Sequence, residues 1–170
     1  MIPWTAMPLK FRLRAVANAL NLSTATGLLL AALTATEVQK GPDGLLLGTN
    51  YRPRLPLAGA FTVGNVIFYR AERPFIDSRP KLLAHEAAHA TQYAWCLGLP
   101  FLPLYAACTA YSLWRTGDPG SRNVFERRAG LADGGYRELP SIDRSAVRLL
   151  LQPLARFRLV PPLSTSRKQP

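Results

Sequence analysis

The chain has 170 residues and a formal net charge of +11. This length suits one domain that buries about two thirds of its surface, so the core needs no disulfide bonds. The chain is 48% hydrophobic and 18% charged, which makes it more apolar than an average soluble protein. Its basic residues are not interleaved with aromatic ones, and no zinc-finger spacing occurs, so the sequence argues against a nucleic-acid partner.

The positive charge is concentrated near the C-terminus, where residues 139–170 carry six Lys or Arg and one Asp. Arginines among leucines suit the surface of an anionic membrane, although a solvated helix face has the same composition.

The cysteines, Cys96 and Cys108, lie in an apolar stretch and are expected to be buried free thiols. Free thiols favour a reducing compartment, so we expect a cytoplasmic protein, peripherally membrane-associated if the basic segment binds lipid.

The N-terminal part of the chain mixes helices with short strands. Residues 9–20 suit a short basic helix, and the polar run that begins at Asn21 is able to cap a second helix over Gly27–Glu37. A Gly-Pro-Asp-Gly turn follows, after which Leu45–Leu47 is predicted as a short strand.

The clearest strand is Phe61–Tyr69, which is rich in β-branched and aromatic residues. Its Gly64-Asn65 pair has two interpretations, a hairpin turn or a bulge within one strand. Because the alternation on either side is short for a hairpin, we expect one bulged strand.

The C-terminal half is predicted to be mostly helical. A helix begins at Asp77-Ser78-Arg79-Pro80 and runs over Lys81–Trp95, a second covers Phe101–Arg115, and a third runs from Asn123 to about Asp133. A last amphipathic helix is expected over Asp143–Leu151. These elements predict a single α+β domain over residues 1–163, with 164–170 as a disordered tail.

The window Trp95–Trp114 contains no charged side chain and is long enough for a transmembrane helix. Gly98, Pro100 and Pro103 interrupt its first part. A full crossing would also place Glu126 across the bilayer from His89. We therefore expect a buried or membrane-apposed helix here.

The segment His85-Glu86-Ala87-Ala88-His89 carries the chemistry that the sequence predicts, and it contains the only two histidines of the chain. On a helix, residues i and i+4 share one face, so both imidazoles are able to bind one ion. Glu86 projects beside them, where its carboxylate is able to act as general base toward a water activated at the metal. The alternative is a pair of core or surface histidines on an alanine-rich helix.

A catalytic zinc site normally has three protein ligands, so one more is needed. Cys96 lies on nearly the same helix face but about 10 Å along the axis from His89, which is too far for a zinc–sulfur bond. Glu126 is the best candidate, because the chain between the two helices is long enough to turn and return. Its alternative role is in a capping box with Asn123. The other candidates are Asp118, Asp133 and Glu138.

Two further roles are predicted around this site. Gln92 lies one turn beyond His89, where it is able to hydrogen-bond a ligand or substrate, although a plain polar position is equally compatible. Tyr136 and Arg127 are both candidates to stabilise an oxyanion, and the spacing selects neither.

The run from His85 to Gln92, followed after a helical hairpin by Asn123-x-Phe125-Glu126-x-x-Ala129, resembles the zincin-fold metallopeptidases of the gluzincin type. It is especially similar to small uncharacterised bacterial zincin-like proteins with this arrangement. The resemblance covers roughly residues 61–136. It implies that the strand Phe61–Tyr69 is the edge of a small sheet beside the helix-borne motif, where an extended peptide could add as a strand. It implies one zinc ion, with these residues in its site: His85, His89 and Glu126 as ligands and Glu86 as base.

Two functions are compatible with these features. The first is a zinc-dependent hydrolase, most simply a peptidase acting on peptides or proteins. The alternative is a non-catalytic binding or assembly module, membrane-associated through its basic and apolar surface, in which zinc is structural. Glu86 separates the two, because a purely structural zinc site has no use for it.

Overall fold

The computed structural model describes residues 4–143. Met1–Pro140 form one compact unit, and the unit from Ser141 onward is described only as far as residue 143. The helix expected over Asp143–Leu151 and the tail at 164–170 thus lie outside the described residues. The elements, in chain order, are η1 (Trp4–Ala6), α1 (Leu9–Leu20), α2 (Ser23–Leu33), β1 (Glu37–Lys40), η2 (Pro42–Gly44), β2 (Leu46–Thr49), β3 (Ala60–Val63), β4 (Val66–Tyr69), α3 (Arg73–Asp77), α4 (Pro80–Trp95), α5 (Phe101–Thr116) and α6 (Val124–Ala129).

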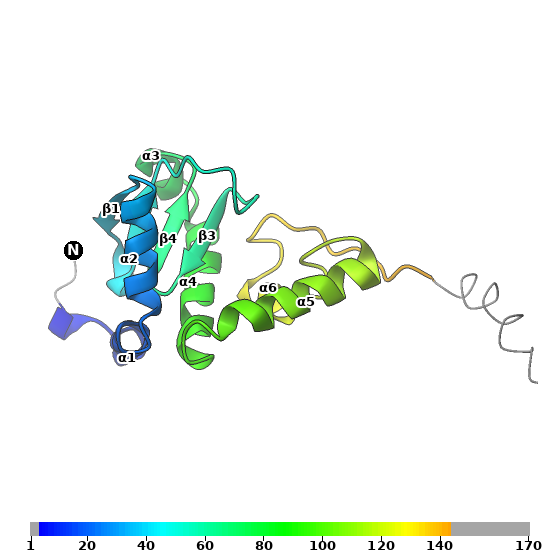
Figure 1. Cartoon of the computed structure of the whole chain (residues 1–170), viewed down its shortest axis with the longest axis horizontal. Coiled ribbons are helices and arrows are strands. Elements are labelled where there is room, and N and C mark those ends of the chain that lie inside the picture. The colour runs from blue at the N-terminus through cyan, green and yellow to red at the C-terminus, as the bar shows by residue number, and fades with distance from the viewer. Residues whose placement is uncertain (1–3, 144–170) are drawn as a thin grey trace, which may run out of the picture. The chain divides into compact units, whose positions relative to one another are not determined.

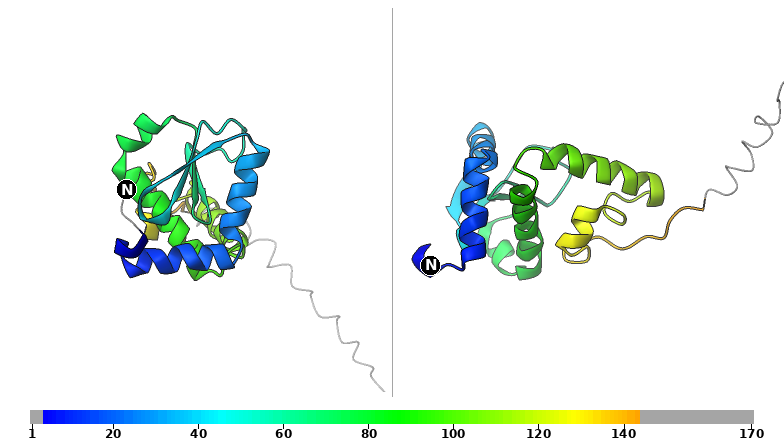
Figure 2. Two further views of the ribbon diagram at one scale, coloured as in Figure 1. Left: turned by 90° about the vertical axis from the view of Figure 1, so that its left-hand side faces the viewer. Right: turned by 90° about the horizontal axis from the view of Figure 1, so that it is seen from below.

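These elements form an α+β fold around one four-stranded mixed sheet (Figure 1). The strand order is β1-β2-β4-β3; β2 and β4 are parallel, and the two outer pairs are antiparallel. The α+β class is confirmed. Of the segment Phe61–Tyr69, only the part in β3 lies at the edge of the sheet, because β4 lies between β2 and β3. Figure 2 shows α1 lying across one end of the sheet, and α5 and α6 belong to the second half of the unit.

The sheet is covered on both faces. The side chains of β4, one of its two central strands, alternate between two apolar clusters. Ile67 and Tyr69 of β4 pack with Leu47 and with Ala90 of α4. Val66 and Phe68 pack on the other face with Ala31 of α2 and Tyr51. Strand alternation with a period of two thus fixes α4 on one face and α2 on the other. The helix that carries the histidine motif is anchored on this core.

The interpretation of Phe61–Tyr69 as one bulged strand is wrong. The segment is a hairpin, in which Gly64 and Asn65 connect β3 to β4. Gly64 has a φ of +63°, and glycine first in a two-residue turn is typical of type II′ hairpins. The turn fits tightly on the start of α2, since a Cβ on Gly64 would lie 2.4 Å from the backbone of Ser23 and Thr24. Gly64 and its partners Ser23 and Thr24 are far apart in the sequence. The local pattern of apolar and polar residues therefore did not predict the turn.

Other predicted boundaries also differ. The helix expected over Gly27–Glu37 begins earlier and ends earlier, at Ser23 and Leu33, because Ala35 adopts a φ of +49° and Glu37 opens strand β1. The strand expected over Leu45–Leu47 is β2, shifted toward Thr49. The helix expected to reach Asp133 ends at Ala129, because Gly130 takes a φ of +98°. Strand β1 and helix α3 were not predicted.

The helices expected over Lys81–Trp95 and Phe101–Arg115 are confirmed as α4 and α5. The Trp95–Trp114 window is therefore divided between two helices. Among the described residues, no single helix has the length and apolar composition to cross a membrane. The pair α1 and α2 meets that criterion together, but the two helices are bent by 70°.

Candidate metal centre

Helix α4 places the two histidines one turn apart on its buried face. His85 and His89 are 2% and 7% exposed, and their Nε2 atoms are 3.1 Å apart. Close approach of both imidazoles follows from the i, i+4 spacing on a regular helix. The predicted pair therefore points into one small volume.

The short helix α6 brings Glu126 to the same place. Its Oε2 lies 3.2 Å from His85 Nε2 and its Oε1 lies 3.5 Å from His89 Nε2. One ligand atom from each of the three residues lies within 4.8 Å of the others, and all three residues are buried. Asn123 alone caps α6, by accepting a hydrogen bond from the Phe125 N–H. Glu126 thus faces the histidines, and the reciprocal capping-box contact is not its role.

The hydrogen bonds behind the histidines fix which nitrogen faces the cluster. His85 Nδ1 lies 3.0 Å from the Gly130 carbonyl, which only accepts, so Nδ1 carries the proton. His89 Nδ1 lies 2.8 Å from Gln92 Oε1, and the Gln92 amide donates in turn to the Phe125 carbonyl. An imidazole whose Nδ1 donates in this way has, in its neutral form, the lone pair of Nε2 directed to the cluster. Gln92 thus has the orienting position that the sequence allowed.

These contacts bring three hydrogen-bond acceptors together without a donor between them. Glu126 Oε2 is buried and makes no hydrogen bond of normal geometry among the described residues. Acceptors held this close repel one another unless a proton or a cation lies between them. Two imidazole nitrogens and a carboxylate are a ligand set that suits zinc and other transition metals. The buried His85, His89 and Glu126 group could therefore hold a metal ion.

Mutual charge and burial set the protonation of the cluster. Burial lowers the pKa of His85, but the nearby carboxylates of Glu126 and Glu86, with the Gly130 carbonyl, raise it above its ordinary value. Burial raises the pKa of Glu126, but contacts with His85, Tyr105 and His89 outweigh it and hold the pKa below its ordinary value. Glu126 is therefore an anion at neutral pH, as a metal ligand must be.

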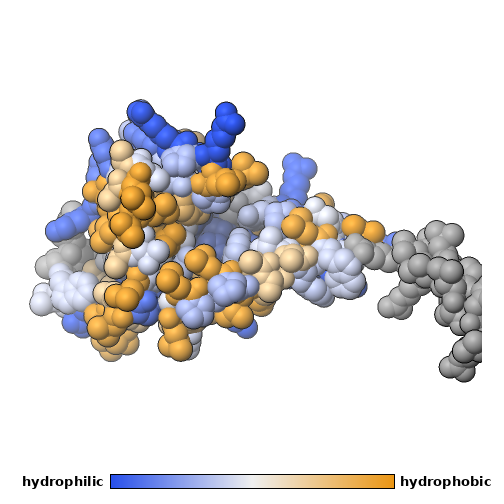
Figure 3. All heavy atoms as spheres, in the orientation of Figure 1, coloured by the Kyte–Doolittle hydropathy of each residue, from blue (hydrophilic) through white to orange (hydrophobic). Residues whose placement is uncertain are grey.

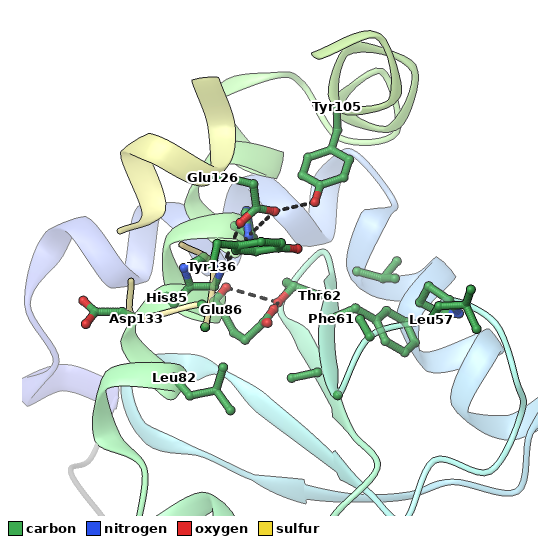
Figure 4. Close-up of a pocket in the computed structure, with 18 of the residues that line it drawn as sticks. Leu57, Phe61, Thr62, Leu82, His85, Glu86, Tyr105, Glu126, Asp133 and Tyr136 are labelled. Atoms are coloured by element: carbon green, nitrogen blue, oxygen red, sulfur yellow. Dashed lines mark hydrogen bonds and ion pairs between the residues drawn. The ribbon is translucent and has the colours of Figure 1, made fainter. Parts of the chain in front are cut away.

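Glu86 is also buried, on the side of α4 that faces the edge strand. Its Oε2 accepts a hydrogen bond of 2.7 Å from Thr62 Oγ1 on β3 (Figure 4). Burial is the main reason why the pKa of Glu86 lies above its ordinary value, although His89, Thr62 and His85 partly offset this. A raised pKa makes the carboxylate a stronger base than an exposed glutamate. The Thr62 contact carries no signal in the sequence, because it depends on the hairpin.

The cluster opens into a cleft of about 730 Å³. One wall is formed by residues 56–63, which include edge strand β3, and the other by side chains of α5 and the segment after α6. His85, Glu86, His89 and Glu126 all line this cleft. Figure 4 shows Glu86 next to Thr62 and Glu126 next to Tyr105. The group of three residues that could hold a metal ion is thus open to this cleft.

Two tyrosines from the second half of the unit complete the cleft. Tyr105 of α5 donates a hydrogen bond to Glu126 Oε1, and sequence reasoning missed it. Tyr136 lines the cleft, whereas Arg127 pairs with Glu138 and donates to the Ser121 carbonyl. Of the two predicted oxyanion candidates, the structure therefore brings only Tyr136 to the site.

The other carboxylates considered as ligands lie elsewhere. Asp118 Oδ2 accepts hydrogen bonds from the backbone of a turn, at Gly120 and Ser121. Glu138 is half-exposed and pairs with arginines. Asp133 lines the cleft but is not in the cluster of three. Cys96 and Cys108 are free and half-buried, so their predicted full burial is not observed, and neither belongs to the cluster.

Gly134 lies close to the imidazole of His85. A Cβ at this position would lie 2.4 Å from His85 Cε1 and 2.6 Å from Nε2, which no real contact tolerates. We predict that Gly134→Ala displaces His85 and weakens zinc binding about 10- to 100-fold, the usual effect of disturbing a ligand's support. Competition with a chromophoric chelator measures this. Gly59→Ala is the matched control, because a Cβ there meets nothing within 4 Å; equal zinc affinities of the two variants would show that His85 keeps its place.

No protein family, curated protein or solved structure matches the chain in comparison. The resemblance to gluzincins therefore depends on the motif residues, and what it implies for this chain is carried forward as a proposal.

Proposed function

We propose that the protein is a zinc-dependent hydrolase that cleaves peptide bonds, with His85, His89 and Glu126 as zinc ligands and Glu86 as general base. The observation that carries this proposal is the convergence of three buried acceptor atoms beside a buried glutamate, all open to one cleft. A structural zinc site is usually closed by four protein ligands, whereas a catalytic site has three and an open position. The described residues supply three.

The proposed chemistry uses each group for one task. Zinc, when bound, lowers the pKa of a water to about 7 and polarises a carbonyl. Glu86 removes a proton from the attacking water as its oxygen bonds to the peptide carbon, and delivers that proton to the leaving nitrogen when the C–N bond breaks. Thr62, which donates to Glu86 Oε2, holds the carboxylate toward the cleft.

Tyr136 is the proposed oxyanion stabiliser. Burial, with the nearby charges of Glu126 and Glu86, raises the pKa of Tyr136 to about 12, so its phenol remains protonated at neutral pH. A neutral phenol is able to donate a hydrogen bond to developing negative charge. Tyr105 is also protonated, since burial and Glu126 raise its pKa, but its hydroxyl is already engaged by Glu126.

An extended peptide is the substrate that fits the cleft best. β3 is the edge strand of the sheet and forms part of the cleft wall, so its free backbone groups are available to pair with an added strand. Leu57, Phe61 and Leu82 line the same cleft and favour apolar side chains. A folded protein would have to present such a segment as a loop.

The direct test is incubation of the zinc-loaded full chain with a degenerate peptide library, with new termini identified by mass spectrometry. We expect cleavage next to apolar residues, and its loss when a chelator removes the metal. Stoichiometric zinc without any cleavage, across the library and unfolded protein substrates, would instead support the alternative function, a non-catalytic binding or assembly module.

A further inference from the structure

Helix α1 packs against the protein with two polar side chains, Arg14 and Asn18. Asn18 is fully buried and donates hydrogen bonds to the Ala90 carbonyl, at 2.8 Å, and to Asn65 Oδ1, at 3.0 Å. Arg14 is buried as well and donates to the Asp43 carbonyl. The large apolar side chains of this helix are exposed instead: Leu9, Leu13, Val16 and Leu20. Their spacing places these four on one face, the reverse of the usual pattern for a surface helix.

Helix α2 repeats this arrangement with small residues inside. Ser23, Gly27 and Ala31 are its buried positions. Gly27 allows the closest approach, since a Cβ there would lie 2.6 Å from the Val63 carbonyl oxygen. The helix leaves these large side chains exposed: Leu28, Leu29 and Leu33. Small residues against the protein and leucines outward are typical of helices that face lipid.

The loop between α4 and α5 extends this surface. Gly98 packs against Asn21 at the junction of α1 and α2, where a Cβ would lie 2.7 Å from the Asn21 side chain. Exposed apolar residues flank the contact on both sides, and Trp95, at 82% exposure, is among the most exposed. We call this surface the apolar corner, formed by the exposed leucines and valine of α1 and α2 with Leu22, Trp95, Leu97 and Leu99. Figure 3 shows hydrophobic side chains gathered over α2 and along the edge formed by α1 and the α4–α5 turn.

Charge separates the apolar corner from the rest of the molecule. The stretches 15–36 and 90–114 contain no Asp, Glu, Lys or Arg, although the chain as a whole carries +11. Lys10 and Arg12 lie on α1 next to its exposed leucines. An apolar surface bordered by cations, on a strongly basic chain, complements a membrane with anionic headgroups.

The bend between α1 and α2 limits the ways in which these two helices could contact a membrane. Together the two helices have the length and apolar composition of a membrane segment, but the 70° angle between them does not suit a straight crossing. Asn18 also ties α1 to the sheet and to α4. We propose that the apolar corner inserts into the interfacial layer of an anionic lipid membrane, with the helices lying in the plane of the surface.

The test is binding of the full chain to vesicles of phosphatidylcholine alone and of phosphatidylcholine with phosphatidylglycerol. We expect binding to the anionic vesicles, with a blue shift of tryptophan fluorescence that Trp95→Phe largely removes. Burial of one leucine changes a binding constant by roughly tenfold or more. Leu13→Asp with Leu29→Asp should therefore weaken binding at least about 100-fold. Both side chains are exposed, so the fold tolerates the changes.

Leu55→Asp is the matched control, because Leu55 is an exposed leucine outside the apolar corner. It should bind vesicles like the unaltered chain. Binding that survives Leu13→Asp with Leu29→Asp, without a blue shift, would mean adsorption through basic residues elsewhere and would overturn the proposal. So would a chain that ignores vesicles but forms a dimer that these two substitutions dissociate, since the apolar corner would then bind a second copy.

Discussion

Replacement of Glu86 by glutamine is expected to lower the turnover of the zinc-loaded protein by about 10²- to 10⁴-fold, the usual contribution of a general base. Glutamine has the shape of glutamate and an oxygen that still accepts the Thr62 hydrogen bond, but it does not take a proton from water. Because Glu86 is not among the three proposed ligands, bound zinc should stay at one ion per chain. Steady-state cleavage of the best library peptide measures the change.

The matched control for this prediction is Glu37→Gln, which changes an exposed glutamate at the start of β1. It should leave turnover unchanged. Turnover that persists in Glu86→Gln with zinc still bound would remove Glu86 from the mechanism, and with it the main reason to regard the site as catalytic. Loss of zinc in this variant would instead show that Glu86 contributes to metal binding.

Replacement of Glu126 by glutamine is expected to weaken zinc binding by more than 100-fold. The change removes the one carboxylate of the proposed ligand set, while glutamine has nearly the same size and shape. The loss should exceed that of Tyr105→Phe, which removes only the hydrogen bond to Glu126 and should cost about 10- to 100-fold. Competition with a chromophoric chelator, at fixed pH, gives both affinities on one scale.

Glu138→Gln controls for the loss of a carboxylate in this part of the chain, because Glu138 pairs with Arg122 and Arg127 and is not among the residues that line the cleft. Its zinc affinity should match that of the unaltered chain. Unchanged affinity in Glu126→Gln would exclude Glu126 as a ligand. Asp133, which lines the same cleft, would then be the next carboxylate to test.

The core of the candidate site was predictable because it depends on local geometry. The spacing of His85 and His89 is meaningful on any regular helix, and the limits of α4 were set by Pro80 and Gly98. Glu126 followed from the need for a third ligand. Tyr105 was not predictable, because it is one of many residues in an uncharged helix and only the turn before α6 brings that helix back to Glu126.

The parts of the fold that escaped prediction are those fixed by distant contacts. The hairpin turn at Gly64 is held against the start of α2, and nothing in the local alternation encodes that contact. Strand β1 has the polar sequence of an exposed edge, so it lacks the apolar pattern of a strand. In α1 the buried positions are polar. The reason is the hydrogen bonds from Asn18 to Asn65 and to the Ala90 carbonyl, which the sequence does not reveal.

Anomalous diffraction at the zinc edge, from crystals of the zinc-loaded chain, tests the central claim most directly. We predict one anomalous peak about 2.0–2.2 Å from His85 Nε2, His89 Nε2 and a Glu126 carboxylate oxygen, with its open side toward Glu86 and the cleft. A zinc-loaded crystal whose anomalous peaks lie away from these three residues would contradict the account.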